Sequence, residues 1–313
     1  MRRPLLLSLL FLVLLCTILL SIVIGPAGTP FLDLDQEVTS TIVFSVRLPR
    51  AIAAALVGIG LAASGVVMQG LFRNSMADPY LLGTSSGGAL GAAFAIVFLN
   101  GTLHWVFAFI GCIVAMAIVY AISVRGGRVP VEQLLLTGIA VSVFLSALLS
   151  FLMYTSDKSL HQIFLWLMGG FWSVSWSDVT IGLLVLPASL SLLLFSRELN
   201  IFSMGEEDAL HLGVDTERMK KGLLLASAFV TGISVAIAGS IGFIGLITPH
   251  LMRLLLGPDH RFLLPGAMMA GGVLLVLSDT LARTIGGEVP VGVITAFFGA
   301  PFFIFLLKRR YAP

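Results

Sequence analysis

Charged residues are scarce in this sequence. Lysine, arginine, aspartate and glutamate make up 11% of the 313 residues, whereas hydrophobic residues make up 58% and the mean hydropathy is +1.06. A soluble domain has about 25% charged residues, so the composition excludes a soluble globular domain. The apolar runs have the length of spanning helices, not the ten-residue alternation of an outer-membrane barrel. The sequence therefore predicts an all-α fold, a polytopic membrane helix bundle.

Cysteines and the motifs of enzymes are also sparse. Cys16 and Cys112 are the only cysteines, and both lie in apolar runs without the spacing of a metal site or a disulfide framework. The phosphate-binding G-x-x-x-x-G-K-[ST], the zinc-binding H-E-x-x-H and the G-x-S-x-G elbow do not occur. We therefore expect no metal site, no cofactor bound by this chain and no enzymatic activity of its own.

Ionisable residues are rare within the apolar segments. Apart from Arg253 and Asp279, which lie near predicted ends, no ionisable side chain falls deep in a segment. Proton relays and buried ion sites in membranes need such residues. Their scarcity argues against an ion-coupled secondary transporter.

Ten segments are predicted to span the membrane. The first has two arginines before its apolar run and lacks a small-x-small cleavage site, so we interpret it as a helix and not as a signal peptide. The eighth is weak because its 15 residues rise only about 22 Å and Pro249 interrupts them. The predicted spans are 5–24, 47–68, 79–99, 105–124, 130–154, 178–196, 219–240, 242–256, 262–282 and 290–308.

The distribution of basic residues predicts the orientation of the spans. An even number of spans places both termini on one side. With the termini inside, fourteen lysines and arginines are cytoplasmic, and only Arg47, Arg50, Lys158 and Arg283 are outside. Because this bias follows the positive-inside rule, we expect a multi-pass protein of the cytoplasmic (inner) membrane with both termini in the cytoplasm.

The two halves of the chain are weakly similar. At an offset of 174 residues, seven of 26 positions are identical, among them Gly58 and Gly232. The second span runs inward and the seventh outward, so a repeat here would be inverted, as is common in transporters. We expect one transmembrane domain, 1–313, with related halves at about 47–154 and 219–308.

One polar stretch, Ser196 to Lys221, holds ten of the 34 charged residues (18 basic and 16 acidic), so it must lie in water between two membrane halves. Ser203 and Glu206 fit the S-x-x-E capping box and Gly213 supplies a left-handed stop, which predicts a helix of about two turns. A short capped helix outside the membrane suggests a docking element; the alternative is an ordinary solvated loop. The candidate residues are Glu206, Glu207, Asp208, Ala209, Leu210, Leu212 and Gly213, within a loop at 197–218.

Small and hydroxyl side chains recur at helical spacing within the spans. Ser142, Ser146 and Ser150 form a polar stripe on the fifth span, which could line a water-filled path or bond back to its own helix. The sequence leaves both interpretations open. Two further rows, Ala54, Gly58, Ala62 and Gly83, Gly87, Gly91, are expected to let helix backbones approach closely.

Three arginines lie at the outer ends of the second and ninth predicted spans. Arg47, Arg50 and Arg283 could extend to lipid headgroups or receive carboxylates from a soluble partner. Physical reasoning from the sequence favours neither interpretation.

Four long motifs resemble one known family. They are RLPRAIAAALVGIGLAASGVVMQGLFRNSMADPYLLGTSSGGALGA (Arg47 to Ala92), GEEDALHLGV, GFIGLITPHLMRLLLGPDHRFLLP (Gly242 to Pro265) and EVPVGVITAFFGAPFFIFLL. In this order, and over nearly the whole chain, they resemble the FecCD-type permeases of type II ABC importers. Those permeases handle iron–siderophore complexes, haem and cobalamin.

The resemblance implies the partners and the roles of two sites. It implies a homodimer or pseudo-dimer in the lipid bilayer with the pathway at the subunit interface, two cytoplasmic ATPase subunits that bind ATP, and an extracytoplasmic substrate-binding protein. No nucleic acid is expected. The coupling helix of the family lies where Glu206 to Gly213 falls here. Arginines equivalent in motif to Arg47, Arg50 and Arg283 meet acidic residues of the binding protein.

The resemblance thus implies a permease subunit of an ABC importer that moves an iron–siderophore complex inward, driven by a separate ATPase subunit. The siderophore is preferred only because it is the commonest substrate of the family, and haem and cobalamin are alternatives. A rival from another class is an ATP-independent secondary transporter or channel. A membrane-embedded enzyme would need a nucleophile or metal constellation that the sequence lacks.

Overall fold

The structure, a computed structural model, describes residues 2–25, 40–285 and 287–310. Within these residues the fold is helical, with one isolated β-bridge between Arg125 and Arg128, and the all-α prediction is confirmed. The elements are α1 (Arg2–Val23), η1 (Ile42–Arg47), α4 (Leu48–Leu71), η2 (Pro79–Leu82), α5 (Thr84–Phe98), α6 (His104–Ser123), α7 (Val131–Tyr154), η3 (Asp157–Ser159), α8 (Leu160–Met168), α9 (Trp176–Gly182), α10 (Val185–Ser191), η4 (Leu192–Phe195), α11 (Ser196–Phe202), α12 (Glu206–His211), α13 (Thr216–Ala238), α14 (Ile244–Leu256), α15 (His260–Thr284) and α16 (Val291–Arg310).

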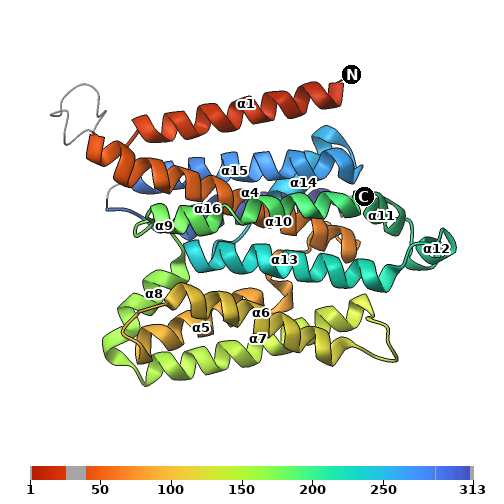
Figure 1. The fold of residues 1–313 in the computed structure, drawn as a ribbon, viewed down its shortest axis with the longest axis horizontal. Coiled ribbons are helices and arrows are strands. Elements are labelled where there is room, and N and C mark those ends of the chain that lie inside the picture. The colour runs from red at the N-terminus through yellow and green to blue at the C-terminus, as the bar shows by residue number, and fades with distance from the viewer. Residues whose placement is uncertain (1, 26–39, 286, 311–313) are drawn as a thin grey trace.

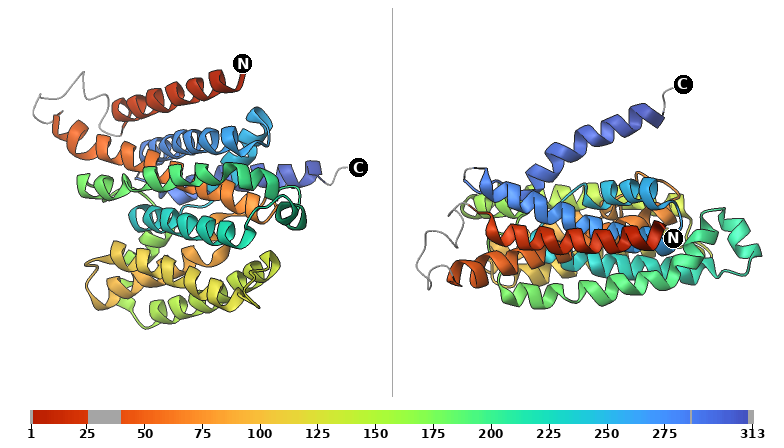
Figure 2. Two further views of the ribbon diagram at one scale, coloured as in Figure 1. Left: turned by 45° about the vertical axis from the view of Figure 1, so that its right-hand side comes forward. Right: turned by 90° about the horizontal axis from the view of Figure 1, so that it is seen from above.

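The long helices lie side by side in a bundle (Figure 1). α4 lies in the middle and contacts α13, α14 and α15. α1 packs on α15 at one edge of the bundle, and α5, α6 and α7 form the opposite edge (Figure 1). α16 leaves the bundle at an angle, which is clear when the molecule is viewed from above (Figure 2).

α4 forms the core because small and aliphatic side chains cover it on all sides. Of its 24 residues, 22 are buried. Gly58 lies directly against the backbone of Gly271 in α15, and Gly65 lies against the backbone of Gly245 in α14. Because a membrane provides little hydrophobic drive between helices, such close backbone contact is a main source of packing energy. The close approach predicted for Gly58 is confirmed.

The third predicted span begins differently from the prediction. Asp78 accepts a hydrogen bond from the backbone N–H of Tyr80 at 2.9 Å and caps the short helix η2. Gly83 then takes a φ of +79° and separates η2 from α5. Gly83 therefore serves its left-handed backbone and not a close backbone contact, while Gly87 packs against the backbone of Gly111 in α6 as expected.

Adding one methyl group at Gly65 is expected to destabilise the bundle. In a Gly65→Ala variant the new Cβ would meet the carbonyl group of Gly245, and backbone cannot move aside as a side chain can. Overpacking of this kind costs about 1–3 kcal/mol. The measurement is the thermal unfolding temperature in detergent. Gly242→Ala is the matched control, since a Cβ there meets nothing within 4 Å; equal unfolding temperatures for the two variants would contradict the prediction.

Ten apolar helical segments correspond in position to the ten predicted spans. Among the described residues, seven are long and apolar enough to cross a membrane, and three, Thr84–Phe98, Ile244–Leu256 and Val291–Phe305, are shorter. The count of ten therefore stays a prediction. The sixth segment is longer than predicted, because α9, α10, η4 and α11 continue from Trp176 to Phe202. The polar stretch consequently begins as helix, in α11, and not as loop.

The two ends of the bundle carry different side chains. The α12 end holds α11, α12 and the turn between α6 and α7, and the start of α1 and the end of α16 lie there too (Figure 1). The arginine end is the opposite one, where α4 begins and α15 finishes, and it holds Arg47, Arg50 and Arg283. The two sets of predicted docking residues thus lie at opposite ends of the bundle.

Candidate functional site

Helix α12 occupies the centre of the polar stretch. Its N-cap is Gly205, and Ser203 instead donates its hydroxyl hydrogen to the carbonyl oxygen of Asn200 at 2.6 Å. The predicted capping box is wrong because α11 extends far enough to take Ser203 into its C-terminal turn. The predicted stop is confirmed, since α12 ends just before Gly213, whose φ is +81°.

The surface of α12 is apolar and acidic, and the helix projects from the end of the bundle (Figure 2). Ala209 is buried against the rest of the chain, while Leu210 and the following Leu212 are 50% and 61% exposed. Glu207 and Asp208 are exposed in the first turn, where the helix dipole favours negative charge. Two leucines beside two carboxylates make a small surface suited to docking.

A buried lysine that sequence reasoning did not single out connects α12 to its neighbours. Lys220, in the second turn of α13, is 1% exposed. Its Nζ donates to Glu206 Oε1 at 2.6 Å, to Glu217 Oε1 at 2.7 Å and to the Val129 carbonyl oxygen at 2.9 Å. Glu217 Oε2 accepts from the Val129 backbone N–H at 3.0 Å. These four residues, the Lys220 cluster, join α12, α13 and the turn between α6 and α7.

A side-chain bridge fixes the segment from which α12 projects. Asn200 of α11 donates from Nδ2 to Asp259 Oδ1 at 2.7 Å, and its Oδ1 accepts from the backbone N–H of His260 at 2.9 Å. Burial acts to raise the pKa of Asp259, but hydrogen bonds from Asn200 and from the Arg261 backbone outweigh it and hold this pKa below its usual value. The charged carboxylate therefore caps α15 and anchors α11 to it.

At the arginine end, Arg50 forms a buried ion pair within the chain. Its Nε donates to Asp279 Oδ1 at 2.9 Å and to Oδ2 at 3.1 Å, and the Asp279 side chain is 0% exposed. Toward the surface, Arg50 Nη1 lies 3.3 Å from Glu288 Oε1, on a side chain that is 49% exposed. Asp279 also lies 3.6 Å from Arg283 Nε. One buried carboxylate thus holds two of the three predicted docking arginines.

Arg47 and Arg283 bind the last turn of α1. Arg47 Nη1 donates to the carbonyl oxygens of Ile22 and Val23 at 3.0 and 2.9 Å, and Arg283 Nη2 donates to that of Ser21 at 2.6 Å. The carbonyl groups at a helix C-terminus lack intrahelical partners, so these cations satisfy them. The structure brings the three arginines together but buries each of them. Their docking role stays a prediction.

The serine stripe of α7 bonds mainly to its own helix. Ser142 Oγ donates to the Gly138 carbonyl oxygen at 2.7 Å, and Ser150 Oγ donates to that of Ser146 at 2.9 Å. Ser146 Oγ lies 3.4 Å from Ser86 Oγ of α5. Ser146 and Ser150 are nevertheless exposed. The stripe is therefore both back-bonded and accessible, and its role in a pathway stays a prediction.

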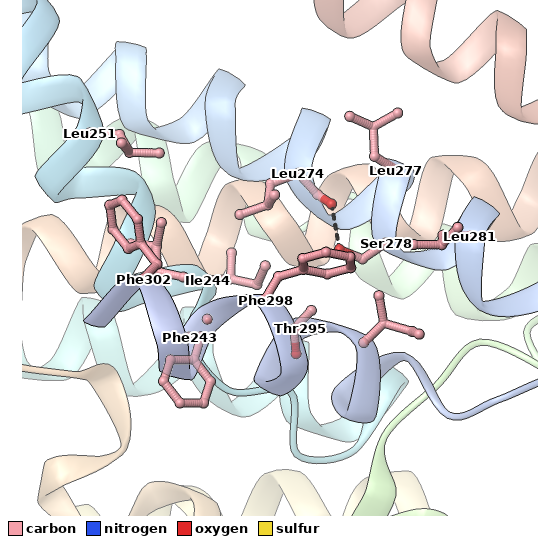
Figure 3. Close-up of a pocket in the computed structure, with 13 residues that line it drawn as sticks. Phe243, Ile244, Leu251, Leu274, Leu277, Ser278, Leu281, Thr295, Phe298 and Phe302 are labelled. Carbon is pink, nitrogen blue, oxygen red and sulfur yellow. Dashed lines mark hydrogen bonds between the residues drawn. The ribbon is translucent and has the colours of Figure 1, made fainter. Parts of the chain in front are cut away.

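An apolar cavity of about 340 Å³ lies between α14, α15 and α16 (Figure 3). Phe298 and Phe302 of α16 face Leu274 of α15 across it (Figure 3). The hydroxyl of Ser278 donates to the Leu274 carbonyl oxygen at 2.8 Å, so this polar group is already satisfied. None of the described residues that line the cavity is charged. The cavity suits an apolar side chain or a lipid chain.

Comparison with known proteins decides the family. A sequence model described as the FecCD transport family matches residues 6–309. This chain belongs to the FecCD transport family. It is 47% identical over 277 residues to the cobalamin import system permease protein BtuC of Halobacterium salinarum, covering 88% of this chain and 75% of the relative. It is 44% identical over 277 residues to the hemin transport system permease protein HmuU of Yersinia pestis, covering 85% and 83%.

Solved structures share the fold of this FecCD chain. A chain from an ABC transporter assigned to the metal-chelate type, in an inward-facing conformation, matches with a TM-score of 0.89 and 36% identity, covering 98% of this chain and 99% of that chain. PsaBC from Streptococcus pneumoniae in complex with Fab matches with a TM-score of 0.56 and 20% identity, covering 88% and 96%. The second likeness shows the fold alone.

This FecCD chain is therefore a multi-pass membrane permease of an ABC importer, a class that works with ATPase and substrate-binding partners. The reported relatives are named for cobalamin and haem. They give no specific support to the siderophore that sequence reasoning preferred.

Proposed function

We propose that this permease moves a macrocyclic metal chelate inward, with cobalamin as the first candidate. The observation that carries the proposal is the 47% identity to a cobalamin import permease over 88% of this chain. Haem is the second candidate, because a hemin transport permease is 44% identical over 85% of the chain. Both candidates replace the siderophore as the preferred substrate.

The pathway is proposed to run between two copies of the chain. The cavity beside α16, at about 340 Å³, is apolar and lies at the small end of the range for ligand pockets, about 300–1,000 Å³, so it does not suit a whole macrocycle with polar edges. The edge helix α7 exposes Phe151 and Tyr154 beside Ser146 and Ser150. A second copy placed on this face would cover the aromatic side chains and leave the hydroxyl groups along the seam.

The α12 end is proposed to face the cytoplasm. With both termini at this end, fourteen of the eighteen lysines and arginines lie on the cytoplasmic side, in agreement with the positive-inside rule. The exposed leucines and carboxylates of α12 would then dock an ABC ATPase, which binds and hydrolyses ATP. The arginine end faces outward.

The arginine end is proposed to receive carboxylates of a substrate-binding protein. Glu288 already lies on the surface side of Arg50, at 3.3 Å, while Asp279 holds the same guanidinium from the buried side. A carboxylate of the partner would displace Glu288 and leave the buried pair intact. Such docking weakens as the salt concentration rises, because exposed charges are screened.

The substrate is tested by ATP hydrolysis in proteoliposomes that contain this chain and its ATPase. A binding protein loaded in turn with cobalamin, haem or a ferric siderophore is added from outside. We expect cobalamin to stimulate hydrolysis most, and the unloaded binding protein is the control.

Each other outcome has a defined meaning. Greatest stimulation by haem would select the second candidate, and greatest stimulation by the ferric siderophore would overturn both macrocycles. Uptake by proteoliposomes that contain this chain alone, without ATPase or ATP, would support the secondary-transporter class instead. Failure of any ABC ATPase to associate with the chain would contradict the proposed role of α12.

A further inference from the structure

Helix α12 has few connections through which a movement could reach the membrane helices. It contains six residues, and only Ala209 among them is buried. Gly205 is its N-cap, and Gly213 follows its C-cap residue, Leu212, so a flexible glycine lies near each end. A polar side-chain contact therefore adds a link to the packing of Ala209. The contact between Glu206, the first residue of α12, and Lys220 of α13 is such a link, at 2.6 Å.

We propose that Lys220 is a positioning residue that transmits the movement of α12 to α7 and α13. The inference rests on the proposed function, in which an ATPase moves α12. Lys220 itself touches neither ATP nor the transported chelate. It acts by holding three segments of the α12 end in one rigid unit.

The bonding capacity of Lys220 is fully used within the cluster. An ammonium group has three N–H donors. In Lys220 they point to Glu206, Glu217 and the carbonyl oxygen of Val129, at 2.6, 2.7 and 2.9 Å. Hydrogen bonds between charged partners are shorter and about twice as strong as neutral ones. Because Lys220 is buried, water does not replace these contacts easily, and the geometry of all three segments is coupled.

The Lys220 cluster is connected to α7 through Val129 and Pro130, the two residues that directly precede this helix. Val129 is held at both polar groups, since its carbonyl oxygen accepts from Lys220 and its N–H donates to Glu217 Oε2 at 3.0 Å. The next residue, Pro130, is the N-cap of α7, and its ring fixes φ. A displacement of Val129 is therefore passed to α7, because little backbone rotation at Pro130 can absorb it. α7 is the helix that carries the exposed serines at 146 and 150.

The proposal is tested by the ratio of transport to ATP hydrolysis in proteoliposomes with the ATPase and the loaded binding protein. In Lys220→Met we expect transport per ATP to fall at least about tenfold, because the lost bond between Lys220 and Glu206 is alone worth a factor of this size. Binding of the ATPase should be unchanged, since the exposed surface of α12 is intact. Lys221→Met is the matched control, because Lys221 is exposed next to Lys220, and it should behave like the wild type.

A distance measurement separates transmission from mere structural support. Spin labels are placed at two exposed positions, His211 and Arg128, after replacement of Cys16 and Cys112. In the wild type the distance between the labels should stay constant when ATP binds, because α12 and the turn move together. In Lys220→Met the distance should change when ATP binds.

Two further results complete the test. If Lys220→Met does not fold, Glu206→Ala takes its place, since it breaks the contact between α12 and Lys220 but leaves Lys220 paired with Glu217 and the Val129 carbonyl oxygen. Wild-type coupling in Glu206→Ala, or in a folded Lys220→Met, would overturn the inference. The proposed function would still stand if Leu210→Asp uncouples transport in the same assay. If the wild-type chain neither binds nor is driven by an ABC ATPase, the proposed function itself fails.

Discussion

Replacing Leu210 with aspartate, or Glu207 with lysine, is expected to separate ATP hydrolysis from transport while the chain still folds. Both side chains are exposed, so neither change buries a charge or opens a cavity within this chain. Aspartate would place a charge where the proposed docking surface offers an apolar side chain, and a buried unpaired polar group costs about 1–3 kcal/mol. Lysine would reverse the charge in the first turn of α12, where the helix dipole disfavours a cation.

The measurement is uptake per ATP hydrolysed in proteoliposomes, together with the unfolding temperature in detergent. Leu210→Met and Glu207→Gln are the matched controls. Methionine keeps an apolar side chain of similar volume, and glutamine keeps the shape without the reversed charge. Both controls should retain most of the uptake. Normal uptake by both charged variants would show that α12 is not the docking element.

Removing the carboxylate of Asp279 is expected to destabilise the chain more than any other proposed substitution. Asp279 is fully buried and lies beside two cationic side chains, Arg50 at 2.9 Å and Arg283 at 3.6 Å. In Asp279→Ala both cations would lose their buried counter-charge. Breaking a buried ion pair from one side costs about 3–5 kcal/mol, because the remaining buried charge loses its buried counter-charge. The measurement is the thermal unfolding temperature of the purified chain in detergent.

Glu288→Ala is the matched control for Asp279→Ala. It removes the other carboxylate that contacts Arg50, but this one is half-exposed, and exposed ion pairs contribute only about 0–1 kcal/mol. Its unfolding temperature should lie close to that of the wild type. The account of the arginine end would be wrong if the two variants were equally stable.

Local signals in the sequence predicted the helices well, because hydrophobic length and glycine position act over a few residues. Gly213 was a correct stop because a left-handed residue ends a helix wherever it stands. The predicted cap at Ser203 was wrong because its hydroxyl group can either cap the helix that follows it or bond back to the helix that precedes it. It satisfies the C-terminal turn of α11 through Asn200, and so it is not available as a cap for α12.

The residues that the sequence did not reveal depend on distant partners. Lys220 is 91 positions from Val129, and Arg50 is 229 positions from Asp279. No spacing rule connects residues so far apart, since only the packing of the bundle brings them together. The burial of the arginines was missed for the same reason. Their positions near span ends suggested exposure, but α1 and α15 cover them.

The contacts of α1 with Arg283 have a consequence for the synthesis of the chain. Arg283 stands 262 positions after Ser21, whose carbonyl group it binds. At a synthesis rate of about 5–20 residues per second, Arg283 is therefore added roughly 13 to 52 s after Ser21. During that time α1 must remain in the bilayer without α15, the helix on which it packs. α1 is the most hydrophobic of the seven long apolar helices among the described residues, and this hydrophobicity keeps it in the bilayer until α15 is made.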